Sequence, residues 1–153
     1  MKTPAMRALE KLGISYEVKE HSKRAFTATQ AAEERGVRLE QIVKAMLVEC
    51  SGGGHVMALL PGHKELSLKK LARFLGEKNV KLAAPEQVTK VTGYHVGAVS
   101  PLGLRTDLPT YMDRRVLKEE LVDISSGRHD AGLELRSEHL LLATGAQLGD
   151  FVR

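Results

Sequence analysis

The chain has 153 residues, 42% hydrophobic and 27% charged, which is typical of one globular domain over residues 1–153. Its 23 Lys and Arg residues against 19 Asp and Glu residues give a formal net charge of +4, a mild excess that suits an anionic partner. No apolar run approaches the ~20 residues that cross a bilayer, and the N-terminus lacks the apolar core of a signal peptide. We therefore expect a cytoplasmic protein without a membrane partner.

Nucleic acid remains a candidate partner, but not as a long single strand. With no Trp, three Tyr and three Phe, the chain lacks the aromatic platform on which successive bases stack. A net charge of only +4, spread along a small domain, predicts few phosphate contacts.

The first third of the chain predicts a helix, a strand and a second helix. Thr3 and Pro4 suit the N-cap and first position of a helix that ends at Gly13. Residues 14–20 alternate apolar and polar side chains, as a strand does. Residues 27–36 begin with the capping-box spacing Thr-x-x-Gln and end in glycine, which predicts a helix.

The middle of the chain predicts a β-hairpin followed by two helices. Residues 41–50 and 55–62 are β-rich runs on either side of a Ser-Gly-Gly-Gly cluster. An amphipathic helix is predicted over 67–76, from a Ser N-cap to a Gly C-cap. A short strand over 80–83 and a Pro-initiated helix over 85–92 follow.

The last third predicts short strands and a final helix. Residues 110–113, 121–126 and 132–136 have strand composition, and the helix-like segment 114–120 lies between the first two. Ser137 is predicted to cap the last helix. Interleaved strands and helices indicate an α/β (mixed α+β) single domain, in which a mixed sheet is flanked by helices.

Lys44 is the first candidate for chemistry. Side chains alternate along a strand, so it shares one face of strand 41–50 with four apolar residues, Ile42, Met46, Val48 and Cys50. Such a lysine either extends its ammonium outward at a sheet edge, which the pattern alone favours, or lines a pocket as a phosphate or oxyanion ligand.

Two glycine-containing stretches are further candidates. Residues 93–103, GYHVGAVSPLG, match neither phosphate-binding glycine motif, yet their glycines would let the backbone approach a ligand and direct amide N–H groups toward it. A plain turn explains them equally well. Residues 125–132, SSGRHDAG, are compatible with a β-turn or with hydroxyls and a basic group at the same pocket.

Neither a metal site, a cofactor nor a thiol nucleophile is predicted. The six His residues show no HExxH spacing and no tight pairing with the single cysteine. Cys50 has no base near it in the sequence, so a packing role is favoured, and as a lone cysteine it cannot form an internal disulfide.

With Lys44 in IVKAMLV, the loop TGYHVGAVSPLG and the stretch SSGRHDAGLEL taken together, the chain resembles the YbaK/prolyl-tRNA-synthetase-associated editing domain family nearly end to end. These proteins are trans-editing deacylases of mischarged aminoacyl-tRNA, and their GxxxP element is matched by Gly97 to Pro101. The resemblance implies a partly barrel-like mixed sheet with the pocket between sheet and loops.

The resemblance also implies the site residues. Lys44 matches the family's essential lysine, and Gly97 opens the loop whose backbone amides contact the aminoacyl ester, so both are expected to be catalytic. Water, the substrate's ribose hydroxyl or a substrate thiol would attack, since no side-chain nucleophile is evident. The expected substrate-binding residues are Gly93, Tyr94, Ala98, Val99, Ser100, Pro101, Ser125, Ser126, Gly127 and His129.

The implied partner is the acceptor end of mischarged tRNA, with tRNA-Pro carrying Cys, Ala or another small amino acid as the expected substrate. Prolyl-tRNA synthetase is a candidate partner, and the protein itself is expected to be a monomer or weak homodimer. The chain departs from the best-known Cys-tRNA-Pro deacylases at Lys19, where they have Tyr, and at Gly132, where they tend to have Asp. These departures weaken the case for cysteine as the preferred group.

Two alternatives to an enzyme remain. One is a non-catalytic tRNA-binding module that acts beside prolyl-tRNA synthetase, and the other is a stand-alone small-ligand binding protein. The retained Lys44 and the intact GxxxP loop favour the deacylase.

Overall fold

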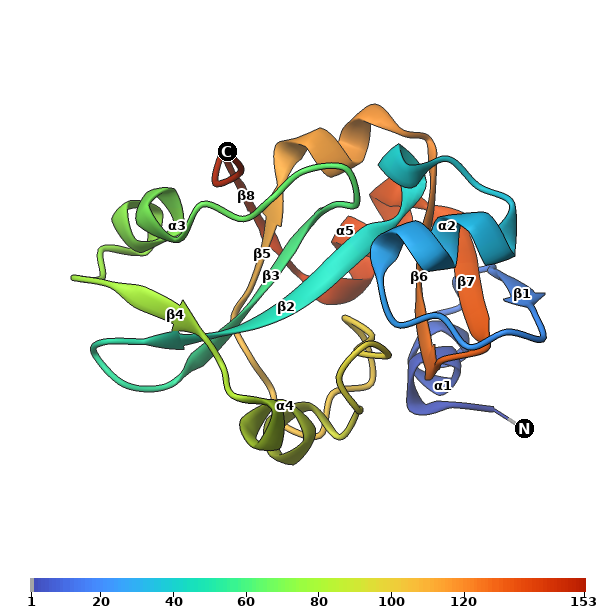
Figure 1. The fold of residues 1–153 in the computed structure, drawn as a ribbon, viewed down its shortest axis with the longest axis horizontal. Coiled ribbons are helices and arrows are strands. Elements are labelled where there is room, and N and C mark those ends of the chain that lie inside the picture. Colours follow the sequence, from blue (N-terminus) through green and yellow to red (C-terminus); the bar gives the residue numbers. More distant parts are fainter. Residues whose placement is uncertain (1) are drawn as a thin grey trace.

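The computed structural model describes residues 2–153, which form two β-sheets and five α-helices (Figure 1). The helices are α1 (Pro4–Lys11), α2 (Ala28–Arg35), α3 (Leu68–Leu75), α4 (Pro85–Thr92) and α5 (Ser137–Thr144), with 3-10 turns η1 (Leu39–Gln41) and η2 (Arg114–Lys118). The strands are β1 (Glu17–Glu20), β2 (Val43–Cys50), β3 (His55–Pro61), β4 (Val80–Leu82), β5 (Thr110–Asp113), β6 (Leu121–Arg128), β7 (Ala131–Arg136) and β8 (Gln147–Gly149). None of the helices within residues 2–153 has the length and apolar character that a membrane crossing requires.

The strands are divided between two sheets. One is antiparallel, in the order β1-β7-β6, and the other is mixed, in the order β4-β2-β3-β5-β8. In the mixed sheet β4, β2 and β3 are antiparallel, whereas β3, β5 and β8 are parallel. A parallel bridge between Ile42 and Asp123 joins the two sheets at the start of β2. The predicted mixed α/β fold class is confirmed, with two joined sheets in place of one.

Side-chain caps fix most helix starts as predicted. The Thr3, Thr27 and Ser67 side chains accept hydrogen bonds from backbone N–H groups in the first turns of α1, α2 and α3. The predicted N-cap Ser137 is instead the first residue of α5, and Arg136 occupies the cap position without a side-chain cap hydrogen bond.

Three segments near the C-terminus differ from the sequence prediction. Strand β6 continues to Arg128, two residues beyond the predicted end, and the helix-like segment after β5 is the 3-10 turn η2. Strand β8 was not predicted, since three residues are too short to show a period. It extends the mixed sheet by pairing with β5.

The two faces of the mixed sheet pack against different parts of the protein. On one face, Leu47 of β2 and Val88 of α4 belong to the core that fills the space between the two sheets. On the other face, Val48 packs with Leu71 of α3 and with Phe151 from the C-terminal segment. Strand β2 therefore carries alternate side chains into two separate cores.

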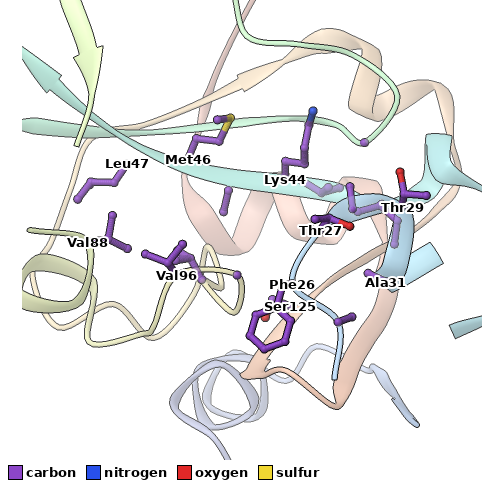
Figure 2. A pocket seen from close by; sticks show the side chains of 18 of the residues that line it. Phe26, Thr27, Thr29, Ala31, Lys44, Met46, Leu47, Val88, Val96 and Ser125 are labelled. Carbon is purple, nitrogen blue, oxygen red and sulfur yellow. The ribbon is translucent and has the colours of Figure 1, made fainter. Parts of the chain in front are cut away.

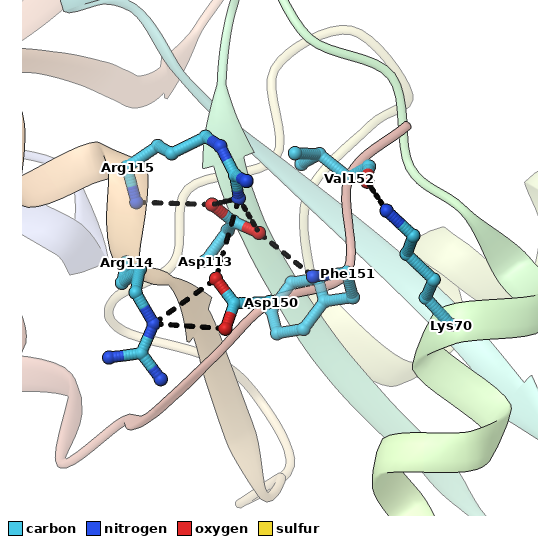
Figure 3. Close-up of polar contacts among 7 residues, drawn as sticks. All are labelled: Lys70, Asp113, Arg114, Arg115, Asp150, Phe151 and Val152. Atoms are coloured by element: carbon cyan, nitrogen blue, oxygen red, sulfur yellow. Dashed lines mark hydrogen bonds and ion pairs between the residues drawn. The ribbon is translucent and has the colours of Figure 1, made fainter.

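A buried aspartate holds the C-terminal segment in place (Figure 3). Asp113 at the end of β5 accepts hydrogen bonds from the backbone N–H of Phe151 at 2.9 Å and of Arg115 at 3.1 Å. Asp150 pairs with Arg114 and, more distantly, with Arg115. These contacts seat the fully buried Phe151 ring beneath α3.

Candidate functional site

A cavity of about 560 Å³ opens along one edge of β2 (Figure 2). Residues 42–47 form one wall, residues 25–31 a second, and Val88 of α4 with Gly97 and Val99 of the glycine-rich loop a third. Within residues 2–153, this lining has two charged side chains, those of Arg35 and Lys44, and it contains no His, Asp, Glu or Cys. The cavity therefore offers cations and backbone groups rather than an acid or base.

The wall formed by β2 is an open strand edge. Strand β4 pairs with β2 only at residues 48–50, and the Ala83 N–H donates to the Leu47 carbonyl. In its first half, β2 pairs with β3 on one side. On the other side, the only pairing within the described chain is the bridge between Ile42 and Asp123. Along a strand, the N–H and C=O groups of successive residues point alternately toward its two edges. Ala45 is two residues from Leu47, so its N–H and C=O point toward the same edge as those of Leu47, where the cavity lies.

Lys44 lies on this open strand edge and also lines the cavity. The sequence offered a sheet edge and a pocket as alternative positions for this lysine, and the structure combines them. Its half-buried side chain rises on the α3 face of β2 together with Met46, whereas Leu47 points the opposite way toward Val88 (Figure 2). The ammonium donates to the backbone carbonyl of Lys64. Burial lowers the Lys44 pKa, and the nearby Glu65 carboxylate opposes that shift.

The glycine-rich loop borders the cavity at Val96, Gly97 and Val99. Gly97 has a φ of 88°, and a Cβ there would lie 3.3 Å from both the His129 Nε2 and the Phe26 Cδ1. The Ala98 N–H donates to the His95 carbonyl at 2.9 Å, so it is occupied by a turn. Within residues 2–153, the amides of Gly97 and Val99 have no hydrogen-bond acceptor, and both residues line the cavity.

Other predicted loop residues brace the loop and lie outside the cavity lining. The Tyr94 hydroxyl donates to the Leu102 carbonyl at 2.6 Å, and the Leu102 N–H donates to the Ser100 hydroxyl at 3.4 Å. Tyr94 and Ser100 are both buried, and burial raises the Tyr94 pKa to about 12. The remaining predicted residues of this loop outside the lining are Gly93, Ala98 and Pro101.

The β6–β7 hairpin contributes one predicted residue to the cavity, Ser125. The Ser126 hydroxyl is buried and donates to the Ala131 carbonyl at 2.6 Å, which stabilises the hairpin. A Cβ at Gly127 would lie 2.6 Å from the Tyr94 ring, so this glycine makes room for that ring. The hairpin is thus mainly a structural support for the loop.

His129 fastens the hairpin to the glycine-rich loop at the rim of the cavity. The Arg24 guanidinium lies 3.3 Å from its Nδ1, which leaves Nε2 as the protonated nitrogen that donates to the Val96 carbonyl at 3.0 Å. The Phe26 ring packs on the imidazole with centroids 4.5 Å apart. Phe26 and Val96 are each about half exposed and form an apolar rim. Phe26 was not predicted from the sequence, although it immediately precedes Thr27, the N-cap of α2.

A buried ion pair beside the cavity was also missed. The Arg35 side chain, 5% exposed, donates to the Asp123 carboxylate at 2.7 Å and to the His21 Nε2 at 3.3 Å. A Cβ at Gly132 would lie 2.6 Å from the Arg35 side chain, so the glycine at this position makes room for the guanidinium. Within residues 2–153, the second Asp123 oxygen has no hydrogen-bond partner, and burial raises the pKa of this carboxyl to about 6 against the effect of Arg35.

Within the described chain, neither a metal-binding cluster nor the single cysteine belongs to the cavity. Residues 2–153 contain no group of three His, Cys, Asp or Glu side chains placed to hold a metal ion. Cys50 is buried in the core beneath α3, where burial raises its pKa and keeps it a neutral thiol.

Comparisons with known proteins connect this geometry to one family. The family model described as the aminoacyl-tRNA editing domain matches residues 22–142. The chain is 32% identical over 151 residues to EbsC of Enterococcus faecalis, a candidate Cys-tRNA(Pro)/Cys-tRNA(Cys) deacylase, and the match covers 97% of this chain and 92% of the relative. It is also 32% identical over 84 residues to the proline–tRNA ligase of Thermosipho melanesiensis, covering 55% of this chain and 15% of the ligase.

Two solved structures have the same fold over nearly their whole length. The crystal structure of a candidate trans-editing enzyme for prolyl-tRNA synthetase superposes with a TM-score of 0.89 at 32% identity, covering 100% of this chain and 99% of that one. The crystal structure of the hypothetical protein APE2540 gives a TM-score of 0.91 at 30% identity, covering 99% of this chain and 100% of that one.

Proposed function

Because this chain belongs to the aminoacyl-tRNA editing domain family, we propose that it is a deacylase that hydrolyses the ester bond of mischarged tRNA. The expected substrate is tRNA-Pro that carries cysteine, alanine or another small amino acid. A relative named for Cys-tRNA(Pro) and the matching segment in proline–tRNA ligases support the proline context.

The observation that carries this proposal is the composition of the cavity lining. It contains no His, Asp, Glu or Cys within the described chain, so it offers neither a general base nor a thiol nucleophile. What it offers is Lys44, together with the unoccupied backbone amides of Gly97 and Val99. The loop amides suit stabilisation of an oxyanion that forms while another group attacks, and Lys44 adds positive charge from the α3 face of β2.

An ester can be hydrolysed by such a site without a side-chain nucleophile. The attacking group is water, which the ribose hydroxyl next to the ester can orient, or a thiol of the aminoacyl group, which displaces the ribose oxygen and leaves a thiolactone that water then opens. In either case the ester C–O bond breaks and the proton of the nucleophile ends on the leaving ribose oxygen. The nucleophile gains effective molarity when it is held beside the carbonyl carbon. The carbonyl oxygen becomes negative as the bond to the nucleophile forms. Fixed N–H donors and a nearby cation then stabilise that charge, and each such donor is worth about 10²–10³ in rate.

The direct test is deacylation of a panel of tRNA-Pro species charged with cysteine, alanine, serine or proline. We expect release of at least one small non-cognate amino acid well above the spontaneous rate, and slower release of proline. Lys44→Ala serves as the inactive control. If the wild-type protein binds these tRNAs but hydrolyses none of them, a non-catalytic tRNA-binding module is the correct assignment.

A further inference from the structure

A second groove lies between α3 and the turn that leads to β4. It has a volume of about 360 Å³, and three of its lining side chains are the cations Lys69, Arg73 and Lys78. Lys69 and Arg73 are one helical turn apart, so they project from the same face of α3. All three are exposed, and within residues 2–153 none has a carboxylate within ion-pair distance or a side-chain hydrogen bond.

The neighbouring acidic and basic groups are already engaged. Glu77, which also lines the groove, accepts a hydrogen bond from the Gly52 N–H at 2.7 Å, and Lys81 pairs with Glu49 at 3.2 Å. The Lys70 ammonium, on the same helix, donates to the Val152 carbonyl at 2.9 Å (Figure 3). The groove therefore holds three cations against the single carboxylate of Glu77, and within residues 2–153 none of the three forms an ion pair.

The positive charge of the whole chain is concentrated in this region. Residues 64–81 contain six Lys and Arg residues against two Glu residues, while the other 135 residues contain seventeen cations and seventeen carboxylates. The net charge of +4 thus comes entirely from this segment. The expectation of a shared positive excess along the chain is wrong.

The groove adjoins the candidate active site through β4. Leu82 lines the large cavity and Val80 lines the groove, and these two residues are about 7 Å apart along the strand. Strand β4 lies between α3 and α4 in Figure 1. The Lys44 ammonium, on the α3 face of β2, bonds to the carbonyl of Lys64, where the basic segment begins.

We propose that the groove lined by Lys69, Arg73 and Lys78 binds the phosphodiester backbone of RNA, in the strand that leads to the aminoacyl end held in the cavity. This placement of the strand rests on the proposed function. Phosphates suit the groove because lysine and arginine are the usual phosphate ligands. Among the described residues, no aromatic side chain lines the groove, so it has no means of stacking bases and contacts the RNA backbone alone.

The test compares two triple variants that lose the same charge. The groove variant is Lys69→Gln/Arg73→Gln/Lys78→Gln. The control variant is Arg7→Gln/Lys11→Gln/Lys118→Gln, which changes three exposed cations of α1 and η2 that likewise have no ion pair in the described chain. Thermal unfolding of both variants establishes that each remains folded.

Titration of uncharged tRNA over a range of salt concentrations measures the phosphate contacts. Each contact contributes roughly 0.7 to the slope of log K against log salt, so the groove variant should have a slope shallower by about 2. Its affinity near 0.1 M salt should fall on the order of 10- to 100-fold. The control variant should match the wild-type protein in both quantities.

A second substrate separates RNA binding from chemistry. The aminoacyl ester of adenosine lacks the upstream phosphates, so the groove variant should hydrolyse it at the wild-type rate while losing kcat/KM on aminoacyl-tRNA.

An unchanged salt slope in the groove variant, or an equal loss of tRNA affinity in the control variant, overturns the proposal. The proposal is also overturned if the groove variant loses binding to phosphatidylserine vesicles but still binds tRNA as the wild-type protein does. That result would identify a membrane surface as the partner of the groove. If the wild-type protein hydrolyses no ester, the proposed function fails, while the tRNA titration still decides the role of the groove.

Discussion

The ammonium group of Lys44 is held by the backbone carbonyl of Lys64 rather than by a carboxylate. A carbonyl orients the ammonium without cancelling its charge, so Lys44 retains a full positive charge at the edge of the cavity. Burial lowers its pKa, and therefore that charge is lost at a lower pH than for an ordinary lysine.

Replacing Lys44 with methionine should abolish most of the deacylation. Lys44→Met keeps most of the side-chain volume and removes the charge, so we expect kcat/KM to fall by about 10²–10³ with little change in the unfolding midpoint. Lys64→Ala is the matched control, because it removes a neighbouring charge but keeps the carbonyl that Lys44 contacts. Near wild-type turnover of Lys44→Met at saturating tRNA would show that this lysine has no catalytic role.

Gly97→Ala should impair activity beyond its effect on stability. Gly97 and Gly145 both have positive φ angles, so an alanine at either position costs about 1 kcal/mol of unfolding free energy. A Cβ at Gly97 also meets Phe26 and His129 beside the cavity, whereas a Cβ at Gly145 meets nothing within 4 Å. Urea unfolding and deacylation measured on both variants should give similar stabilities but a loss of activity in Gly97→Ala alone. Equal activity in the two variants would mean that the loop is a plain turn.

Cys50→Ser should remain active. The thiol is buried beneath α3, its pKa is raised, and it does not line the cavity. A buried hydroxyl at this position costs about 1 to 3 kcal/mol, so Cys50→Ala provides a second variant without that polar group. Deacylation by either folded variant at the wild-type rate is the expected result. An acyl adduct trapped on the Cys50 sulfur would contradict it.

The Asp123 carboxyl should make the protein less stable as the pH rises from about 4 to 6. Its pKa is about 6 in the folded protein against an ordinary value of 3.8, so the folded state binds more protons in this window. The unfolding free energy should therefore fall by about 3 kcal/mol as the pH rises through the window, and should then level off above it. Urea unfolding of the wild-type protein and Asp123→Asn, compared at each pH, isolates this effect. The opposite slope would mean that Arg35 lowers the Asp123 pKa below its ordinary value.

Local sequence signals predicted the local structure well. The Thr and Ser caps fixed α1, α2 and α3, and the glycine cluster placed the β2–β3 hairpin, because each depends on a few adjacent residues. The short strand β8 and the division into two sheets depend on pairing between distant segments, which no local period reveals.

The site was predicted only in part for a similar reason. A strand period made Lys44 a candidate and the family's GxxxP element singled out Gly97, and both residues line the cavity. The Arg35–Asp123 pair joins residues 88 positions apart, and its signal in the sequence is a glycine at position 132 whose missing side chain makes room for the guanidinium. Tyr94 was predicted to contact the substrate because it lies in the glycine-rich loop. In the folded protein its hydroxyl is buried and donates to the Leu102 carbonyl, so it braces that loop instead.

The brace formed by Tyr94 has a consequence for substrate affinity. Because the Tyr94–Leu102 hydrogen bond and the His129–Val96 contact close the loop in the protein alone, the conformational entropy of ordering that backbone is lost during folding rather than on binding. Under the proposed function, a substrate would meet amides that are already fixed, and the free energy of its contacts would go into affinity and into stabilising the reacting ester. Loosening this brace should weaken binding without removing any group that touches the substrate.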